Sequence, residues 1–180
     1  MGRLACGDDR GRDICVFSFR GPDRVRRGRI PGEQMSKPSD EYCTPAWLFD
    51  ALDMEFGPFA VDVAATKENT KCMAYWNESQ NALSRDDWVA GTPGHKWFCN
   101  PPFSRVAKDE WIEHATKQPA PGVMLLPVRV MSNKAFHAAL ASGASLVAIK
   151  GRVAFELDGV PQPGNPWPTI CLVFPGGGAK

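Results

Sequence analysis

The sequence lacks the features that would place the chain in a membrane or on a secretory route. No apolar stretch approaches the roughly 18 residues that a membrane helix needs. Near the N-terminus, Asp8, Asp9, Arg10, Arg12 and Asp13 interrupt any apolar run, so we expect no signal peptide. The six cysteines are scattered, with no C-x-x-C pair and no histidine at zinc-ligand spacing, which argues against a disulfide framework and a metal site. We therefore expect a cytoplasmic protein without bound metal.

Charge is unevenly distributed, although the formal net charge is only +1. Residues 1–34 hold eight arginines and no lysine against five acidic residues, a net charge of +3, and the remainder carries −2. Because this segment also has few apolar residues, we predict a disordered extension over residues 1–37. Met35 is a candidate natural start, and the alternative is an arginine-rich arm that binds phosphates. A single domain is expected over residues 38–176, followed by a flexible tail at 177–180.

Hydrophobic periodicity predicts strands that alternate with helices, which indicates a three-layer α/β sheet. The first helix is expected to have Thr44 as its N-cap and Pro45 in its first turn. Ligands of such sheets bind beyond the carboxyl ends of the strands, where Asp62 and Asn100 fall. The expected helices cover 46–56, 106–117 and 133–141. The expected strands cover 59–65, 96–99, 122–128, 145–149 and 170–174. Of the segments between them, 66–75 is expected to be a polar connection, 82–88 a weak strand or turn, and 151–168 a hairpin with a long exposed loop.

The tetrapeptide Asn100-Pro101-Pro102-Phe103 follows the predicted strand 96–99 and is the motif that most directly indicates a chemistry. A planar NH2 group is a poor nucleophile, because its lone pair is delocalised into the attached ring or carbonyl. An Asn side-chain oxygen and the next backbone carbonyl can each accept one N–H, which draws electron density onto the nitrogen. Two prolines stiffen the loop and remove competing donors, and Phe103 can stack on a base. The tetrapeptide resembles the active-site loop of amino-methyltransferases.

A rigid turn is the other interpretation of this tetrapeptide. A Pro-Pro pair followed by an aromatic residue also suits a tight turn after a strand, and four-residue patterns recur by chance. The rest of the sequence therefore has to decide between the two.

Five ordered segments over about residues 40–175 resemble the small phage-type DNA N-6-adenine methyltransferases. The segments are Tyr42-x-Thr44-Pro45, Asp62-Val63-Ala64, Asn100-Pro101-Pro102-Phe103, Leu125-Leu126-Pro127-x-Arg129 and Gly151-Arg152-Val153-x-Phe155. The resemblance implies a Rossmann-like S-adenosylmethionine-dependent methyltransferase fold, with a mostly parallel sheet and a C-terminal antiparallel strand. It also implies site-specific methyl transfer to the N6 amine of adenine in DNA, by an enzyme that a phage or prophage encodes.

The resemblance implies roles for particular residues. Asn100, Pro101, Pro102 and Phe103 match the catalytic loop. The Asp62 carboxylate would accept hydrogen bonds from the ammonium group or the ribose hydroxyls of S-adenosylmethionine. The residues expected to bind this cofactor are Tyr42, Thr44, Pro45, Asp62, Val63, Ala64 and Asn81. Without the resemblance, the segment from Tyr42 to Pro45 reads equally well as a helix cap, and Asp62 as an ordinary acid at the end of a strand.

The sequence departs from the family pattern at two places on the cofactor side. Glycines usually follow the first strand of a methyltransferase, where the backbone approaches the cofactor, but this chain has Ala64-Ala65-Thr66. An Asp-Gly-Leu-like arrangement of relatives is replaced by Asn81-Ala82-Leu83. Modest affinity for the cofactor is therefore expected.

The expected partner is double-stranded DNA with a flipped adenine, and no membrane or obligatory protein partner is implied. Solvated surface charge is the alternative for the basic residues of the expected DNA contact. The chain has no room for a separate target-recognition domain, so loops such as 104–110 and 156–168 are expected to read the DNA sequence. The residues expected to contact DNA are Ser104, Arg105, Arg129, Lys134, Arg152 and Phe155, with Phe155 against the flipped base.

Two further classes of function stay open at this point. The same loop could act on an RNA base amine or on a protein glutamine amide, because the tetrapeptide recognises a planar NH2 group and not a whole substrate. The nonenzymatic alternative is a degenerate module that binds DNA or the cofactor without catalysis.

Overall fold

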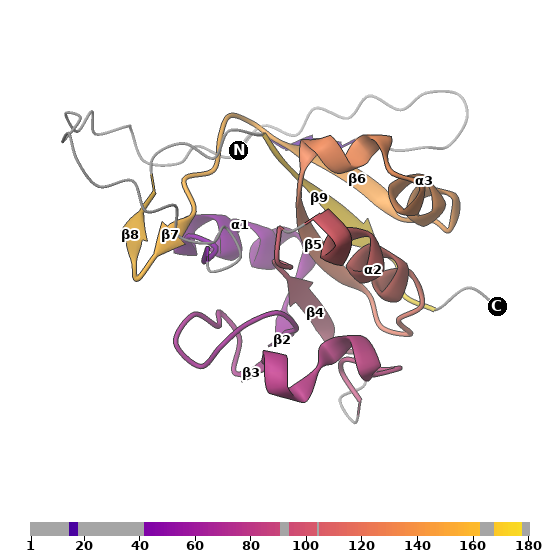
Figure 1. Cartoon of the computed structure of the whole chain (residues 1–180), viewed down its shortest axis with the longest axis horizontal. Coiled ribbons are helices and arrows are strands. Elements are labelled where there is room, and N and C mark those ends of the chain that lie inside the picture. The colour runs from indigo at the N-terminus through magenta and orange to yellow at the C-terminus, as the bar shows by residue number, and fades with distance from the viewer. Residues whose placement is uncertain (1–14, 18–41, 91–93, 104, 163–167, 178–180) are drawn as a thin grey trace.

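The computed structural model describes residues 15–17, 42–90, 94–103, 105–162 and 168–177 (Figure 1). The strands are β1 Cys15–Phe17, β2 Phe59–Asp62, β3 Ala74–Tyr75, β4 Lys96–Cys99, β5 Gly122–Pro127, β6 Ser145–Ile149, β7 Glu156–Leu157, β8 Val160–Pro161 and β9 Thr169–Phe174. The α-helices are α1 Ala46–Phe56, α2 Arg105–Thr116 and α3 Lys134–Ala141. Three short 3-10 helices are η2 Glu78–Gln80, η3 Ala82–Ser84 and η4 Val128–Ser132.

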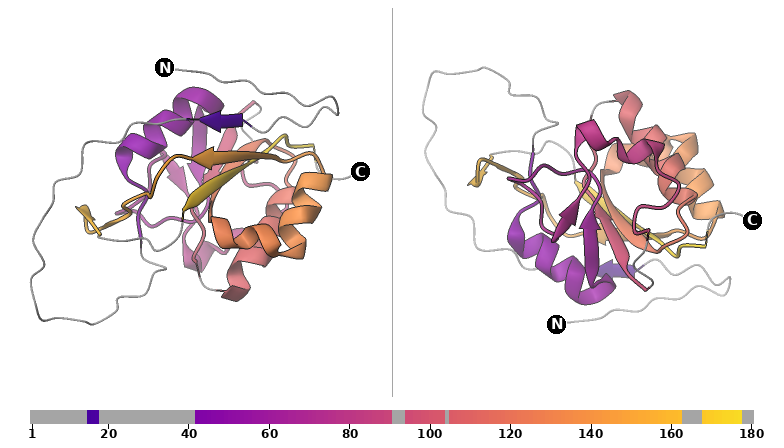
Figure 2. Two further views of the ribbon diagram at one scale, coloured as in Figure 1. Left: turned by 90° about the horizontal axis from the view of Figure 1, so that it is seen from above. Right: turned by 90° about the horizontal axis from the view of Figure 1, so that it is seen from below.

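Seven strands form one sheet in the order β1-β6-β9-β5-β4-β2-β3. Strand β9 is antiparallel to its neighbours β5 and β6, and every other pair is parallel. Helix α1 covers one face, whereas α2 and α3 cover the other (Figure 2). The predicted three-layer, Rossmann-like arrangement with a mostly parallel sheet and a C-terminal antiparallel strand is thus confirmed.

Alternate residues of the central strands enter two separate hydrophobic cores, as the two-residue period of a strand requires. Trp97 and Met124 lie in the core under α2 and α3. Phe98 and Leu125, their neighbours in β4 and β5, lie in the core under α1. Because both faces are covered, β5 is buried along its whole length, which explains its uninterrupted apolar sequence.

Helix α1 begins one residue later than the capping pattern predicts. Its N-cap is Pro45 and not Thr44, and no side-chain hydrogen bond caps it. The Pro45 carbonyl instead accepts hydrogen bonds from the backbone N–H groups of Leu48 and Phe49, at 3.0 and 3.2 Å. The predicted end is correct, since Gly57 is the C-cap. Leu48, Phe49 and Leu52 are buried at the helical spacing that predicts the element.

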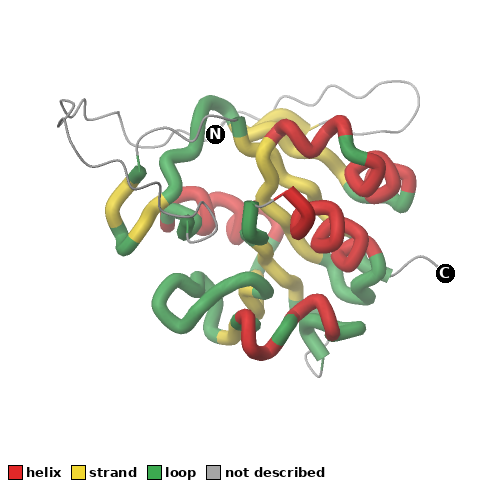
Figure 3. The backbone as a smooth tube through the Cα atoms, in the orientation of Figure 1, coloured by secondary structure: helices red, strands yellow, loops and turns green. Residues whose placement is uncertain are grey.

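Several predicted segments differ from the structure. Residues Cys15–Phe17, within the segment predicted to be disordered, pair in parallel with β6; the rest of residues 1–37 lies outside the described part. The predicted strand 59–65 ends at Asp62, and the connection 66–75 contains β3, after a long loop (Figure 3). Residues Ala82–Ser84 form a 3-10 helix and no strand. No helix among the described residues has the length and apolar character to cross a bilayer.

Candidate active site

The site lies where β2 and β4 end side by side at the carboxyl edge of the sheet. After β2 the chain first adds β3 on one side and then returns to add β4 on the other. The strand order therefore reverses between β2 and β4, and the crevice at such a switch point is where open α/β sheets bind ligands. Asp62 is paired with Phe98, and Asn100 follows β4 directly. The topology thus brings together the two residues that the sequence singles out.

The Asn100 carboxamide is held by only one of its two polar atoms. Its Nδ2 donates a hydrogen bond to the Tyr42 carbonyl at 3.0 Å. Since a carbonyl accepts and does not donate, this contact sets which way the amide is turned. Its Oδ1 is buried and has no hydrogen-bond partner among the residues that the structure describes. A buried acceptor left unpaired costs about 1–3 kcal/mol, so the oxygen is poised to accept an N–H group from a bound molecule.

The remainder of the tetrapeptide is packed into the protein. Pro101 is buried and Pro102 is partly buried. The Phe103 ring meets the Phe155 ring edge-on, with the ring centroids 5.6 Å apart. The Phe103 carbonyl accepts hydrogen bonds from Lys108 Nζ and Arg129 Nη2. The loop therefore leaves the sheet as a fixed element, which agrees with the stiffness expected of two prolines.

The carboxyl group of Asp62 is buried but accepts weak hydrogen bonds from the described residues around it. It is 4% exposed, and within the described part of the chain its oxygens accept only long hydrogen bonds, from the backbone N–H groups of Ala64 and Lys71 at 3.5 and 3.4 Å. Desolvation raises the pKa of Asp62 from 3.8 to about 7, since the two backbone contacts and the Lys71 charge offset it only in part. A ligand that brings strong N–H or O–H donors would stabilise the ionised carboxylate here.

The segment from Tyr42 to Pro45 joins the site to the hairpin of β7 and β8. Cys43 and Glu156 form an antiparallel bridge, with reciprocal backbone hydrogen bonds of 2.8 and 2.9 Å. The Gln162 N–H adds a bond to the Phe155 carbonyl at 2.8 Å, so the hairpin continues to the residue that supports Phe103. A hairpin is present within the expected region, but it joins Glu156–Leu157 to Val160–Pro161 by a short turn, and residues 163–167 of the expected long loop lie outside the described part. One edge of this hairpin pairs with Cys43, next to the Tyr42 carbonyl that accepts from Asn100.

The other residues expected to bind the cofactor differ in their surroundings. Thr44 and Pro45 are buried, and Ala64 is partly buried beside Asp62. Val63 is fully buried in the core under α2 and α3, so its side chain is part of the packing and only its backbone lies at the strand end. Asn81 is exposed and adopts a left-handed conformation, with φ of 42°, between η2 and η3.

Among the residues expected to contact DNA, the structure separates exposed from occupied side chains. Arg152 and Lys134 are exposed. Arg129 reaches back to the Phe103 carbonyl at 3.0 Å. Phe155 is 2% exposed and packs against Phe103, so in this structure it supports the loop and does not face solvent. Ser104 lies outside the described residues, as does the side chain of Arg105.

Lys108 follows the tetrapeptide in the sequence, which makes it a candidate to face DNA phosphate, but the structure places it inside the protein. Its side chain is 2% exposed and donates to the Phe103 carbonyl. A signal existed in the sequence, because Lys108 shares the apolar spacing of Trp111, Ile112 and Ala115 on the buried face of α2. A lysine on that face needs an internal acceptor, and the end of the preceding loop provides it.

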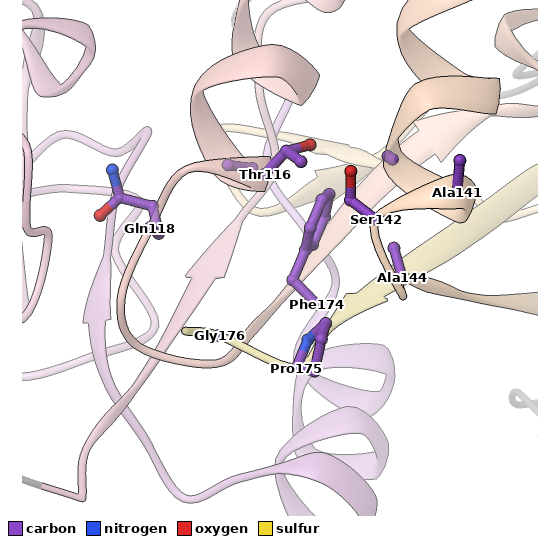
Figure 4. Close-up of a pocket in the computed structure, with 10 residues that line it drawn as sticks. Thr116, Gln118, Ala141, Ser142, Ala144, Phe174, Pro175 and Gly176 are labelled. Atoms are coloured by element: carbon purple, nitrogen blue, oxygen red, sulfur yellow. The ribbon is translucent and has the colours of Figure 1, made fainter. Parts of the chain in front are cut away.

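A cavity of about 340 Å³ lies at the opposite, amino edge of the sheet. Figure 4 shows Phe174 between Thr116 and Ser142, with Gln118 at the side. Its lining comes from the ends of α2, α3 and β9, far from the carboxyl ends of the parallel strands, and consists mainly of small side chains. Neither Asp62 nor Asn100 borders it, so the chemistry of the strand ends and this hollow are separate features.

Comparison with known proteins agrees with the geometry. The family model described as DNA N-6-adenine-methyltransferase (Dam) matches residues 33–173. The protein of that name from Escherichia phage T1 is 30% identical over 123 residues, which cover 67% of this chain and 49% of the phage protein. YfdM of Escherichia coli strain K12, whose name marks it as a suspected methyltransferase, is 33% identical over 75 residues, which cover 41% of this chain and 81% of YfdM. No solved structure was found to match.

Proposed function

Because this chain belongs to the DNA N-6-adenine-methyltransferase family, we propose that it uses S-adenosylmethionine to methylate the N6 amine of adenine in DNA. The observation that carries the mechanism is the buried Asn100 Oδ1, an acceptor without a partner at the carboxyl end of β4. The matched family region runs through every residue of the site, from Tyr42 to Phe155. The resemblance of the five sequence segments and the family match thus agree on adenine in DNA as the substrate.

The chain's own groups suffice to hold and activate a planar amine. Asn100 Oδ1 accepts one N–H of the adenine amine, and the Pro101 carbonyl accepts the other. Both contacts favour localisation of the nitrogen lone pair, which then points away from the plane of the base. The contact from Asn100 Nδ2 to the Tyr42 carbonyl keeps the oxygen, and not the NH2 group, turned toward the amine. The proton that the amine loses after methylation passes to solvent.

The residues at the end of β2 fit a bound cofactor that carries hydrogen-bond donors. Bound S-adenosylmethionine supplies the electrophilic methyl group. The Asp62 carboxylate, whose hydrogen bonds with the described residues are two long ones, would accept hydrogen bonds from its ammonium group or ribose hydroxyls. Tyr42, Thr44, Pro45 and the backbone at Val63 and Ala64 would line the same side. Asn81, which is exposed, would contribute at the rim.

We assign the DNA contact to the surface around the tetrapeptide. The exposed Arg152 and Lys134 would meet phosphates, together with Ser104 and Arg105, which follow the tetrapeptide in the sequence. An adenine turned out of the duplex would lie against the Phe103 ring, which Phe155 supports from beneath. Loops near the same edge would read the DNA sequence. The chain spans about half the length of the phage T1 relative.

The test is methyl transfer by the purified full chain to DNA from a methylation-deficient host, with tritiated S-adenosylmethionine. We expect label in DNA and N6-methyladenine among the digested nucleosides, and long-read sequencing then gives the sequence context. Total RNA and glutamine-containing protein serve as alternative acceptors in parallel reactions. Label in either of these but none in DNA would refute the proposal. Calorimetry with the cofactor alone distinguishes an inactive enzyme, which binds it, from a DNA-binding module, which gives no heat.

A further inference from the structure

Two cationic side chains donate hydrogen bonds to one carbonyl oxygen, at the last residue of the tetrapeptide. The Phe103 carbonyl accepts hydrogen bonds from Lys108 Nζ and from Arg129 Nη2, the second at 3.0 Å. Lys108 belongs to α2 and Arg129 belongs to η4. A third contact ties α2 to the end of η4, since Nδ2 of Asn133, the C-cap of η4, donates to Asp109 Oδ1 at 2.6 Å. The end of the loop is therefore held from two sides by a connected frame.

The positions of the two side chains argue against a role as phosphate contacts. Lys108 is 2% exposed, so its ammonium group cannot reach a DNA backbone. An ammonium group in that position is tolerated because acceptors within the protein replace water. Arg129 is an exposed residue, yet its guanidinium group turns back to the same oxygen. The convergence of two charged donors is stronger than a neutral contact, so it holds the carbonyl firmly.

We propose that Lys108 and Arg129 are positioning residues, which hold the Phe103 carbonyl and so fix the acceptors of Asn100 and Pro101 for the amine. Displacement of Phe103 is transmitted to those acceptors, because the intervening prolines restrict the φ angles. Reactions that depend on alignment are sensitive to shifts of about 1 Å. The kinetic consequence rests on the proposed methyl transfer, whereas the mechanical role does not. The assignment revises the expectation that Arg129 is primarily a DNA contact.

Kinetics of three variants test the proposal in the full chain. Lys108→Met and Arg129→Gln each remove one donor, and Lys117→Met repeats the first substitution at an exposed position just beyond α2. We expect the first two to lower kcat at saturating DNA by roughly tenfold or more, with Lys117→Met at the wild-type value. The slope of log KM for DNA against log salt should not change.

Loss of a phosphate contact gives the reverse pattern, a slope reduced by about one with kcat retained. That pattern in Arg129→Gln, or an unaltered kcat in Lys108→Met, overturns the proposal. Arg129 lies at the surface, so its variant remains a valid test even where Lys108→Met folds poorly.

Hydrogen exchange of the protein without substrate gives a readout that does not depend on activity. Amides around Phe103 and in the first turns of α2 should exchange faster in Lys108→Met and Arg129→Gln, and at the wild-type rate in Lys117→Met. If this pattern holds while the wild type transfers no methyl group to DNA, the proposed function fails and the positioning role stands. If the wild type is active and both exchange and kcat are unchanged in the variants, the positioning role fails alone.

Discussion

Two carboxamide side chains at opposite ends of the sheet are used in different ways. Gln118, before β5 at the amino end, is 1% exposed, and both of its groups are paired: Oε1 accepts from the Trp88 N–H at 2.8 Å, and Nε2 donates to the Arg85 carbonyl at 3.2 Å. Asn100, at the carboxyl end, pairs only its Nδ2 group. We therefore interpret the fully paired Gln118 carboxamide as structural, and the partly unpaired Asn100 carboxamide as the one available to a substrate.

The position of the cavity, taken alone, would assign the functional site to the amino end of the sheet. The cavity of about 340 Å³ borders Gln118, at the end where the carboxamide is already satisfied. Its lining side chains are mostly small, and the Thr116 hydroxyl donates to the Ile112 carbonyl. The carboxyl end has the unpaired Asn100 oxygen and the poorly solvated Asp62 instead. We therefore assign the function to the carboxyl end on the basis of unpaired hydrogen-bonding groups and not of empty volume.

Asn100→Ala should have the largest effect on function and little effect on stability. Removal of the acceptor that holds the amine is expected to lower kcat by roughly 10²–10³-fold. The loss of one hydrogen bond is offset by the removal of an unpaired buried acceptor, so the melting temperature should stay within a few degrees. Methyl-transfer kinetics and thermal unfolding measure the two quantities. Wild-type activity in this variant would contradict the assigned mechanism.

Gln118→Ala is the matched change at the other end and should show the reverse pattern. It leaves the buried Trp88 N–H without its acceptor and removes the bond to Arg85, which should lower the free energy of unfolding by about 2–3 kcal/mol. Denaturant unfolding measures this loss. The kcat value should stay at the wild-type level at temperatures where the variant is folded. A large drop in kcat there would show that the two ends are coupled.

The sequence predicts some, but not all, of the features that distinguish the two ends of the sheet. Periodicity gives β4 and β6 with their observed ends, and it places Asp62 and Asn100 at strand ends. The sequence does not reveal which strands are neighbours, and so gives neither β1 beside β6 nor the bridge at Cys43. Those contacts join residues far apart in the chain. Local pattern carries no information on them.

Asp62→Asn should weaken cofactor binding by about tenfold while it stabilises the protein at neutral pH. A hydrogen bond to a charged acceptor is replaced by one to a neutral amide. In the wild type, the ionised form binds the donors of the cofactor, so affinity should decline as pH falls below 7, where the carboxyl becomes protonated. Calorimetry between about pH 5.5 and about pH 8.5, which brackets this titration, should show the dependence in the wild type only.

The raised pKa of Asp62 also predicts how the free energy of unfolding depends on pH. The pKa of Asp62 is raised in the folded state to about 7 from 3.8, so the folded protein retains a proton that the unfolded chain releases between these values. The free energy of unfolding should therefore decrease as pH rises from about 4 to about 7, by an amount on the order of a few kcal/mol. Asp62→Asn should remove this part of the decrease. An identical pH profile in both proteins would rule out a buried, poorly solvated carboxyl.

Ser142→Leu should have the smallest effect, because it alters the rim of the cavity at the end that we assign to architecture. Ser142 is exposed, and substitutions at such positions change stability by about 0.5 kcal/mol or less. Both kcat and KM for DNA and cofactor should equal the wild-type values. A loss of cofactor binding would reverse our choice between the two ends. Its control is Asn100→Ala, measured in the same assay.

The bridge between Cys43 and Glu156 has a consequence for biosynthesis. It closes a loop that contains every element from α1 to β6, and the entropic cost of closure grows with the length of the loop. Such a contact is nonlocal and is expected to form with the whole sheet rather than with any single helix. The Tyr42 carbonyl that orients Asn100 is adjacent to this bridge. A nascent chain therefore carries the tetrapeptide well before the contacts that orient Asn100 can form, so under the proposed function we expect no methyl transfer to DNA until Glu156 has been synthesised.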